Sequence, residues 1–366
     1  MKKKQIEWIN ILRGFAIILI VLGHAIGYSK KLNILTIYLS SFYVPLFFFI
    51  SGYLHNEDNQ EKLNVFCKRK AKRILIPYFV FAILSLIPYY LFASGIQSNL
   101  SSTKNISSNI FQSILWIIYG SGQGENLSQN TPLWFLPCFF IVVLIAKLVS
   151  YLSKKYKHKL KYICIGIFFL IIGYIVYKYF NYPFPFNIET ALVMLYFYYL
   201  GTSLKSLEVP STKKLLVLGI ILTIVGFSLT LGSSKISCRY NDYNGEYLLF
   251  IISSSLTCIG YTLIFQNFNK CNILSYIGKH TIPILVVHKM PLVVFQTYFG
   301  PVSYYLKNGN TISQLLCSIF ITILSIICSL IAFHIINKFL PIVYGNDKVL
   351  NKKHKIGTII TNFLCL

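Results

Sequence analysis

The sequence predicts an all-α, polytopic integral membrane protein with about ten transmembrane helices and one short interfacial or re-entrant helix. Three observations predict this class: 55% of the 366 residues are hydrophobic, the mean hydropathy is +0.63, and only 12% are charged. Soluble domains carry about 25% charged residues, so the composition excludes an ordinary soluble protein. The net charge of +24 does not indicate a nucleic-acid partner, because the basic residues gather in short segments between apolar runs.

The first apolar run, residues 8–27, is long enough to cross a bilayer, since about 20 residues at 1.5 Å each match a hydrocarbon core of roughly 30 Å. It contains Arg13 and His24, eleven residues apart, so the two share one helix face with about 16 Å between them. Ionisable groups at membrane depth usually face a protein interior or a wet cavity. Two plainer alternatives stay open: Arg13 reaches the cytoplasmic interface, or His24 packs as a neutral histidine against a neighbouring helix.

Nine further runs predict the remaining spans. The second is bent by Pro45, and the third follows a basic run and carries Pro77 and Pro88. Residues 110–119 are apolar but too short to span, so they predict the interfacial or re-entrant helix. The nine runs are 34–54, 73–93, 131–152, 161–180, 187–204, 215–232, 246–265, 273–299 and 312–339.

The Lys and Arg distribution sets the expected orientation. With a cytoplasmic N-terminus, the inner segments hold 23 of these residues and the outer segments hold 7, as the positive-inside rule requires. We therefore expect a multi-pass protein of the plasma membrane with both termini in the cytoplasm. Residues 1–345 form the membrane domain and 346–366 a basic cytoplasmic tail. The nine cysteines show no CxxC pair, so we expect no metal site and no bound cofactor.

Chemistry is expected at the two ends of the first span. Arg69, Lys70 and Arg73 approach the inner leaflet near Arg13, and a guanidinium fork suits the phosphate of a cytosolic molecule. The alternative is a topology signal that binds lipid headgroups. The imidazole of His24 is suited either to take a proton from a sugar hydroxyl or to carry an acyl group. Glu189 and Glu246 are the available orienting carboxylates, unless both are solvated acids at helix N-termini.

Five motifs resemble the acyltransferase 3 family, and most closely its fucose 4-O-acetylase-like branch. They are RGFAIILIVLGH at 13–24, VPLFFFISGYL at 44–54, KAKRILIPY at 70–78, TPLWFLPCFF at 131–140 and, more weakly, GKHTIPILVVH at 278–288. Members of that family are ten-helix membrane proteins. They take an acyl group, usually acetyl from cytosolic acetyl-CoA, and pass it to a hydroxyl of an extracytoplasmic or lipid-linked saccharide.

The resemblance implies the roles of specific residues. His24 matches the essential histidine of the first helix, Arg13 its arginine, and Lys70 with Arg73 the basic pair of the third helix. Arg69 lies beside that pair, and all three basic residues are expected to bind acyl-CoA. The candidates for acceptor-side or supporting roles are Tyr43, Ser51, Trp134, Glu189 and His288.

Two departures from the family pattern are relevant. Lys70 stands where many relatives have arginine, which weakens a bidentate phosphate role at that position. Tyr43 stands where the branch often has histidine, which counts against a two-histidine site. The expected partners are thus acyl-CoA, a surface polysaccharide or lipid-linked glycan, and membrane lipids.

Two readings compete with an O-acyltransferase. A polysaccharide flippase or transporter would use Arg13 and His24 to bind substrate without covalent chemistry. The other reading is a structural or sensing membrane protein, and it rests on the absence of a complete set of catalytic polar side chains in any one segment.

Overall fold

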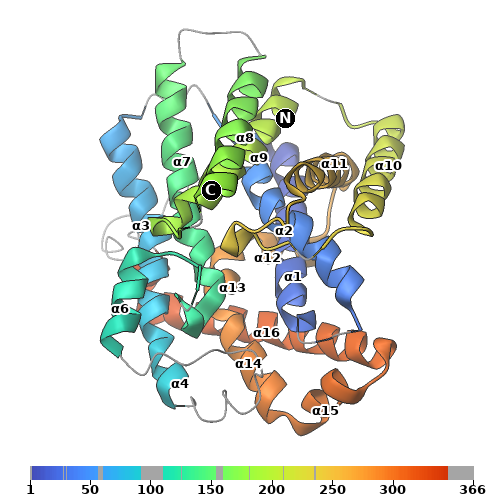
Figure 1. Cartoon of the computed structure of the whole chain (residues 1–366). Coiled ribbons are helices and arrows are strands. Elements are labelled where there is room, and N and C mark those ends of the chain that lie inside the picture. Colours follow the sequence, from blue (N-terminus) through green and yellow to red (C-terminus); the bar gives the residue numbers. More distant parts are fainter. Residues whose placement is uncertain are drawn as a thin grey trace.

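The computed structural model describes residues 2–27, 29, 31–56, 61–91, 110–124, 126–153, 160–180, 182–208, 210–234 and 236–344. These residues form helices joined by turns (Figure 1). The α-helices are α1 Lys2–Ile26, α2 Asn33–Tyr53, α3 Leu63–Leu84, α4 Leu86–Leu91, α6 Ile110–Tyr119, α7 Phe135–Leu152, α8 Lys161–Tyr179, α9 Ile188–Ser206, α10 Lys213–Thr230, α11 Tyr247–Phe265, α12 Asn272–Lys279, α13 Thr281–Val287, α14 Lys289–Tyr298, α15 Gly300–Asn308 and α16 Thr311–Phe339. The 3-10 helices are η1 Ser128–Trp134, η2 Pro185–Asn187, η3 Cys238–Tyr240 and η4 Pro341–Tyr344.

The predicted fold class is confirmed. Among the described residues, eight helices are long and apolar enough to cross a membrane, and the bent pair α13 and α14 makes a ninth when counted as one span. Helix α9 has nineteen residues but is not among these eight, because its tyrosines and Glu189 make it less apolar. It packs between α2 and α8. With α9 included, each of the ten predicted spans coincides with a described helix or broken helix.

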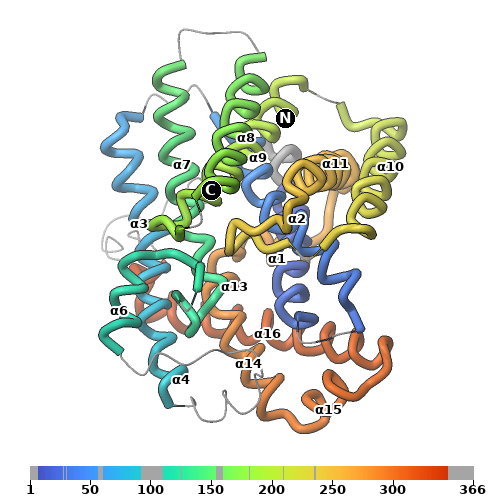
Figure 2. The backbone as a smooth tube through the Cα atoms, in the orientation of Figure 1, coloured from blue at the N-terminus to red at the C-terminus, as the bar shows by residue number. Residues whose placement is uncertain are grey.

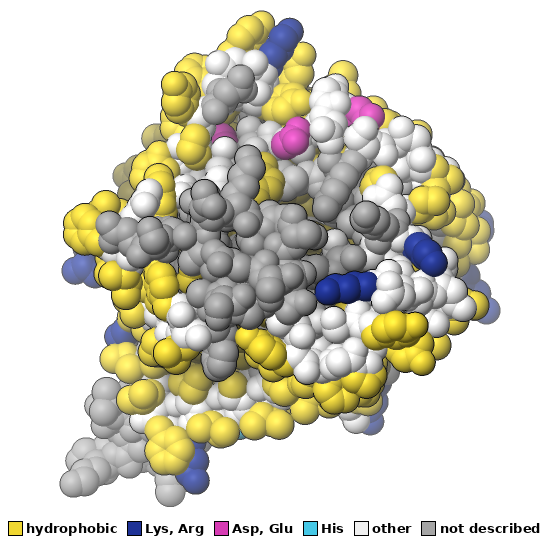
Figure 3. Space-filling model, turned by 60° about the horizontal axis from the view of Figure 1, so that its bottom comes forward, with side chains coloured by type: hydrophobic (Ala, Val, Ile, Leu, Met, Phe, Trp, Pro, Cys, Tyr) yellow, Lys and Arg dark blue, Asp and Glu magenta, His cyan; other side chains and the backbone are white. Residues whose placement is uncertain are grey.

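The helices divide into inner and outer members. In α1 and α11, 61% of the spanning window is buried inside the protein, whereas α8 and α10 bury only 17% of theirs. A helix that is apolar on its exposed side needs lipid around it, so α8 and α10 lie at the lipid-facing periphery. On the face turned forward in Figure 3, hydrophobic side chains cover much of the described surface and only a few charged side chains lie among them.

Helix α1 occupies the centre of the bundle and packs against α2, α11, α12, α13, α14 and α16. Its crossing with α12 is close because both helices present glycine there. A Cβ atom on Gly14 would overlap the carbonyl oxygen of Leu274, and one on Gly278 would overlap that of Asn10. Small residues let two backbones approach in this way inside membranes. The crossing fixes α1 against the segment that carries His288.

Two predicted spans have different boundaries in the structure. Helix α3 begins at Leu63, so the basic run near Arg73 is helical, as expected from the good helix propensity of Lys and Arg. The predicted span 273–299 is divided into α12, α13 and α14, with breaks at His280 and His288. Pro283 and Pro291 each occupy the third position of the helix that follows a break, where a missing N–H is tolerated.

Three further points of the organisation are the short helix, the region before the last span and the C-terminal tail. Helix α6 has the predicted bounds, Ile110–Tyr119, and stays too short to span. Helix α15 was not predicted; in Figure 2 the chain steps from α13 through α14 and α15 to α16, which crosses the lower part of the view. The predicted tail at 346–366 lies outside the described residues.

Candidate functional site

An apolar cleft runs along one face of α1, between this helix and α2, α7 and α13. Its empty volume is about 540 Å³, open solvent included. Arg13, Ile17 and Ile20 of α1 line it at intervals of four and three residues, so they lie on one helix face. The same face continues to His24, one turn beyond Ile20. The other lining residues are Phe47, Ile50, Ser51, Phe135, Leu136, Phe139, Thr281, Ile282 and Leu285.

Arg13 is the charged residue that lines this cleft. Its Nη2 atom donates a hydrogen bond to Oγ1 of Thr281, 3.1 Å away, at the start of α13. The side chain therefore faces protein and cleft, and the alternative in which it reaches the membrane interface does not hold. Because α3 contributes no residue to the lining, the cleft reaches Arg13 between α2, α7 and α13 rather than beside the basic start of α3.

Two histidines meet at the other end of this face of α1. The ring centroids of His24 and His288 are 5.4 Å apart, and the ring planes are inclined by 36°. Tyr43 put a two-histidine site in doubt, and the structure brings a second histidine beside His24 from elsewhere in the chain, at the break between α13 and α14. Tyr43 lies close by, since a Cβ atom on Gly23 would be 3.2 Å from its Cε1 atom.

The hydrogen bonds of His288 determine its tautomer. The residue is fully buried, and its Nδ1 lies 2.9 Å from the carbonyl oxygen of Ile284. A carbonyl oxygen only accepts, so Nδ1 carries the proton and Nε2 of the neutral ring presents a lone pair. Within the described part of the chain, Nε2 has no hydrogen-bond partner. An unpaired buried acceptor of this kind is costly and marks a place for a further donor.

Arg239 holds the loop that contains Gly122, Gly124 and Asn126, near the His24 end of α1. Its guanidinium donates to the carbonyl oxygens of Gly122, Gly124 and Asn126, the last at 3.2 Å. Burial lowers the pKa of Arg239. Arg239 and Lys289 both lie near enough to His24 to act on it electrostatically. Trp134 packs against the same loop, because a Cβ atom on Gly122 would be 2.6 Å from the Cβ of Trp134 and 2.9 Å from the Cγ of Arg239.

Glu189 lies at the same end of the molecule, and its hydrogen bonds within the described residues go to groups other than His24. Its side chain is 1% exposed and accepts hydrogen bonds from Nε2 of Gln123 at 2.7 Å and from the amide of Phe184 at 3.2 Å. The alternative of a solvated acid at a helix N-terminus is therefore wrong for Glu189. The carboxylate of Glu189 therefore connects the loops before α7 and α9. The carboxylate of Glu246 accepts a hydrogen bond from the backbone amide of Ser234.

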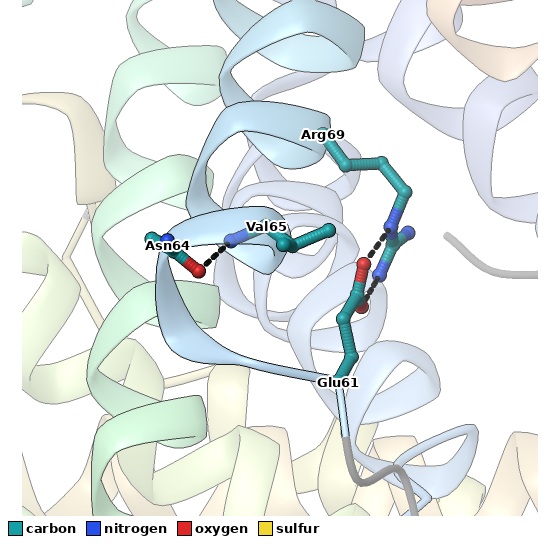
Figure 4. A network of polar contacts seen from close by, with 4 residues as sticks. All are labelled: Glu61, Asn64, Val65 and Arg69. Atoms are coloured by element: carbon teal, nitrogen blue, oxygen red, sulfur yellow. Dashed lines mark hydrogen bonds and ion pairs between the residues drawn. The ribbon is translucent and has the colours of Figure 1, made fainter.

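The basic side chains of α3 lie around Phe66. Arg69 makes a two-point ion pair with Glu61, from Nη2 at 2.6 Å and Nε at 3.0 Å (Figure 4). The guanidinium of Arg69 and the ammonium of Lys70 lie 5.3 and 5.6 Å from the centroid of the Phe66 ring. Lys147 of α7 lies 5.6 Å from the same ring and joins the group. Lys70 is buried, whereas Arg73 is partly exposed one turn further on.

Sequence reasoning missed several polar residues near the two ends of the α1 face. Lys147 belongs to the group around Phe66, and Arg239 holds the loop near His24. Gln296 donates to the carbonyl oxygen of Ala25, and Asn130 donates to that of Val286. No charge pattern in the sequence marks these four residues. The available signal was an amide within an apolar run, as in PLVVFQTYF around Gln296. In the described residues there is no group of three or more His, Cys, Asp or Glu able to hold a metal ion, and the described cysteines are unpaired.

Comparison with protein families gives one match. The family model of acyltransferase 3, described as an acyltransferase domain, matches residues 6–334. No curated protein and no solved structure matches the chain.

Proposed function

Because the chain belongs to the acyltransferase 3 family, we propose that it transfers an acyl group, first of all acetyl, from cytosolic acyl-CoA to a hydroxyl of a surface polysaccharide or its lipid-linked saccharide precursor. The coarser conclusion, a multi-pass membrane acyltransferase, follows from the family match and the apolar helices. The choice of a saccharide acceptor is supported by the motifs shared with the fucose 4-O-acetylase-like branch.

The cleft along α1 is the observation that carries this proposal. Its lining on α1 runs from Arg13 to Ile20, one turn before His24, and Arg13 and His24 are about 16 Å apart by helix rise. Its apolar lining suits the flexible, weakly polar arm that ends in a thioester, while the charged nucleotide of acyl-CoA stays with basic side chains. We assign that nucleotide to Lys70 and Arg73, with Arg69 and Lys147 beside them, and we assign Arg13 to the arm where it enters the cleft.

The chemistry proposed for His24 takes one of two forms. As a general base, the imidazole takes the proton of the acceptor hydroxyl, the oxygen bonds to the thioester carbonyl carbon, the C–S bond breaks, and the proton passes to the departing CoA thiolate. As a carrier, the imidazole nitrogen first takes the acyl group and releases CoA, and the hydroxyl then displaces the imidazole. Both forms require donor and acceptor to meet at His24.

The proposed orientation places both termini in the cytoplasm and the Arg239 loop outside the plasma membrane. It is supported by the excess of Lys and Arg in the segments that contain Arg69 and residues 154–161. In this orientation the donor reaches Arg13 from the inner side, and the acceptor reaches His24 beneath the loop held by Arg239.

Acceptor-dependent release of CoA tests the proposed function. Purified protein in lipid nanodiscs, given acetyl-labelled acetyl-CoA and the lipid-linked saccharide fraction of the source cells, is expected to release CoA and label the saccharide. Omitting the saccharide should reduce CoA release to the background of empty nanodiscs if His24 is a general base, or to at most one CoA per protein if it is a carrier. A polysaccharide flippase would give neither labelled saccharide nor CoA, and that result would contradict the proposal.

The ion pair of Arg69 gives a prediction on donor binding. Glu61→Gln should lower the KM for acyl-CoA about two- to fivefold, because the guanidinium fork of Arg69 becomes available to phosphate and a partly solvated ion pair holds it by only about 1 kcal/mol. Steady-state kinetics at low ionic strength measure this change. Glu246→Gln, in the segment between α10 and α11, is the control and should leave the KM for acyl-CoA unchanged. A raised KM in Glu61→Gln would show that the ion pair itself supports the site.

A further inference from the structure

Three side chains near His24, two of them fully buried and that of Gln296 partly buried, share one unusual hydrogen-bond pattern. Asn130 donates from Nδ2 to the carbonyl oxygen of Val286 at 2.9 Å, and Gln296 donates from Nε2 to that of Ala25 at 3.2 Å. His288 donates from Nδ1 to that of Ile284 at 2.9 Å. Each bond goes to a carbonyl oxygen, which only accepts, so the donor nitrogen of each side chain is fixed without ambiguity.

The remaining polar atom of each side chain is an acceptor without a partner. Oδ1 of Asn130, Oε1 of Gln296 and Nε2 of His288 are all buried and unbonded among the described residues. Asn130 and His288 have no exposed surface at all. A buried acceptor left unpaired is costly, so native proteins supply such atoms with a donor from water or ligand.

The three residues belong to elements that meet around the outer end of α1. Gln296 bonds Ala25, the residue next to His24, and His288 packs its ring against that of His24. Asn130 of η1 bonds Val286, two residues before His288. Helices α13 and α14 both contact α1 and η1, so the three residues belong to elements that pack against one another.

We propose that Asn130, His288 and Gln296 form an acceptor subsite that binds an uncharged, hydroxyl-rich sugar ring through its O–H donors. This inference rests on the proposed function and narrows its acceptor. Three unpaired acceptors need hydrogen atoms, which sugar hydroxyls supply. Phosphate and carboxylate oxygens only accept and would leave all three unpaired. The cations Arg239 and Lys289 near His24 could favour an anion instead, and the test therefore includes a charged sugar.

The test measures kinetics with named probes. Full-length protein in nanodiscs receives labelled acetyl-CoA with the methyl glycosides of glucose, galactose, mannose and N-acetylglucosamine, or with glucose 6-phosphate. At least one neutral glycoside is expected to raise CoA release above the no-sugar background, and glucose 6-phosphate is not. In Gln296→Met the KM for that glycoside should rise about three- to tenfold, the equivalent of one neutral hydrogen bond, while the KM for acetyl-CoA stays unchanged.

The matched control is Gln266→Met in the turn after α11. Gln266 is similar in that its Oε1 is buried and unpaired among the described residues, but its Nε2 donates to the hydroxyl of Tyr53 at the end of α2 rather than to a carbonyl oxygen near His24. The control should leave both KM values unchanged. Asn130→Leu is a second variant expected to raise the glycoside KM. Asn130 also donates a hydrogen bond to Ser85, so Asn130→Leu can fail to fold. In that case the glycoside KM of Gln296→Met alone tests the subsite.

The outcomes separate this inference from the proposed function. If the wild-type protein acylates a neutral glycoside and Gln296→Met has the same glycoside KM, the subsite is wrong and the acyltransferase stands. If only glucose 6-phosphate stimulates CoA release, the acceptor is anionic and the subsite is wrong again. If no sugar and no cellular saccharide fraction stimulates release, the proposed function itself fails.

Discussion

His24→Ala is expected to abolish acyl transfer while the protein still inserts into the membrane. The imidazole lies at the end of the α1 face that begins with Arg13, next to His288, and alanine has no group that takes a proton or carries an acyl chain. Loss of a general base typically lowers the rate about 10²- to 10⁴-fold. Removing a polar group from an apolar helix does not impair insertion, so expression should match the wild type.

The measurement is transfer of labelled acetyl to saccharide, normalised to folded protein. His334→Ala is the matched control, because His334 is exposed near the end of α16 and its side-chain hydrogen bond in the described part of the chain goes to Tyr276. It should retain transfer. More than about a tenth of wild-type activity in His24→Ala would show that another group acts as the base. Labelled acetyl retained on the wild-type protein without acceptor, and absent from His24→Ala, would identify the carrier form.

Gly14→Ala is expected to destabilise the protein and remove most of its activity. The added methyl would overlap the carbonyl oxygen of Leu274, which is backbone and cannot rotate away. Overpacking costs about 1–3 kcal/mol, and backbone overlap belongs at the upper end of that range. Separation of α1 from α12 also displaces Arg13 from Thr281, and a shift of about 1 Å at a site can reduce turnover about 100-fold.

Thermal unfolding in detergent, with CoA release measured on the same samples, checks this prediction. We expect a Tm lower by about 5 °C or more. Gly232→Ala is the control, since nothing lies within 4 Å of the Cβ position there. A Gly14→Ala protein that melts and turns over like the wild type would mean that α1 and α12 do not cross so closely.

The sequence predicted the helical elements well, because the bilayer imposes a minimum apolar length that residues 8–27 and most later runs satisfy. It also placed Arg13 and His24 on one face of one helix, since that relation follows from helix geometry alone. Predictions that depend only on apolar length and helix geometry can be made without knowing the tertiary contacts.

The partners of these residues could not be predicted, because they come from distant parts of the chain. Thr281 lies 268 residues from Arg13, and Gln296 lies 271 residues from Ala25. The run 273–299 reads as one apolar span, and the prolines that divide it do not reveal which carbonyl oxygens the breaks leave for side chains. Glu189 was misjudged for the same reason, since its burial depends on Gln123 and the Phe184 backbone.

The division of residues 272–298 into three helices has a consequence for biosynthesis. These helices have 8, 7 and 10 residues, and each alone is shorter than the roughly 17 residues needed to span a bilayer. The first helix emerges from the ribosome early with His24, whereas His288 follows more than 260 residues later. The late segment has to dock on the helices already in place, against Gly14 of α1 in particular. The histidine pair is therefore completed only after residues 281–298 have been made, and a shorter nascent or truncated chain carries His24 without its partner.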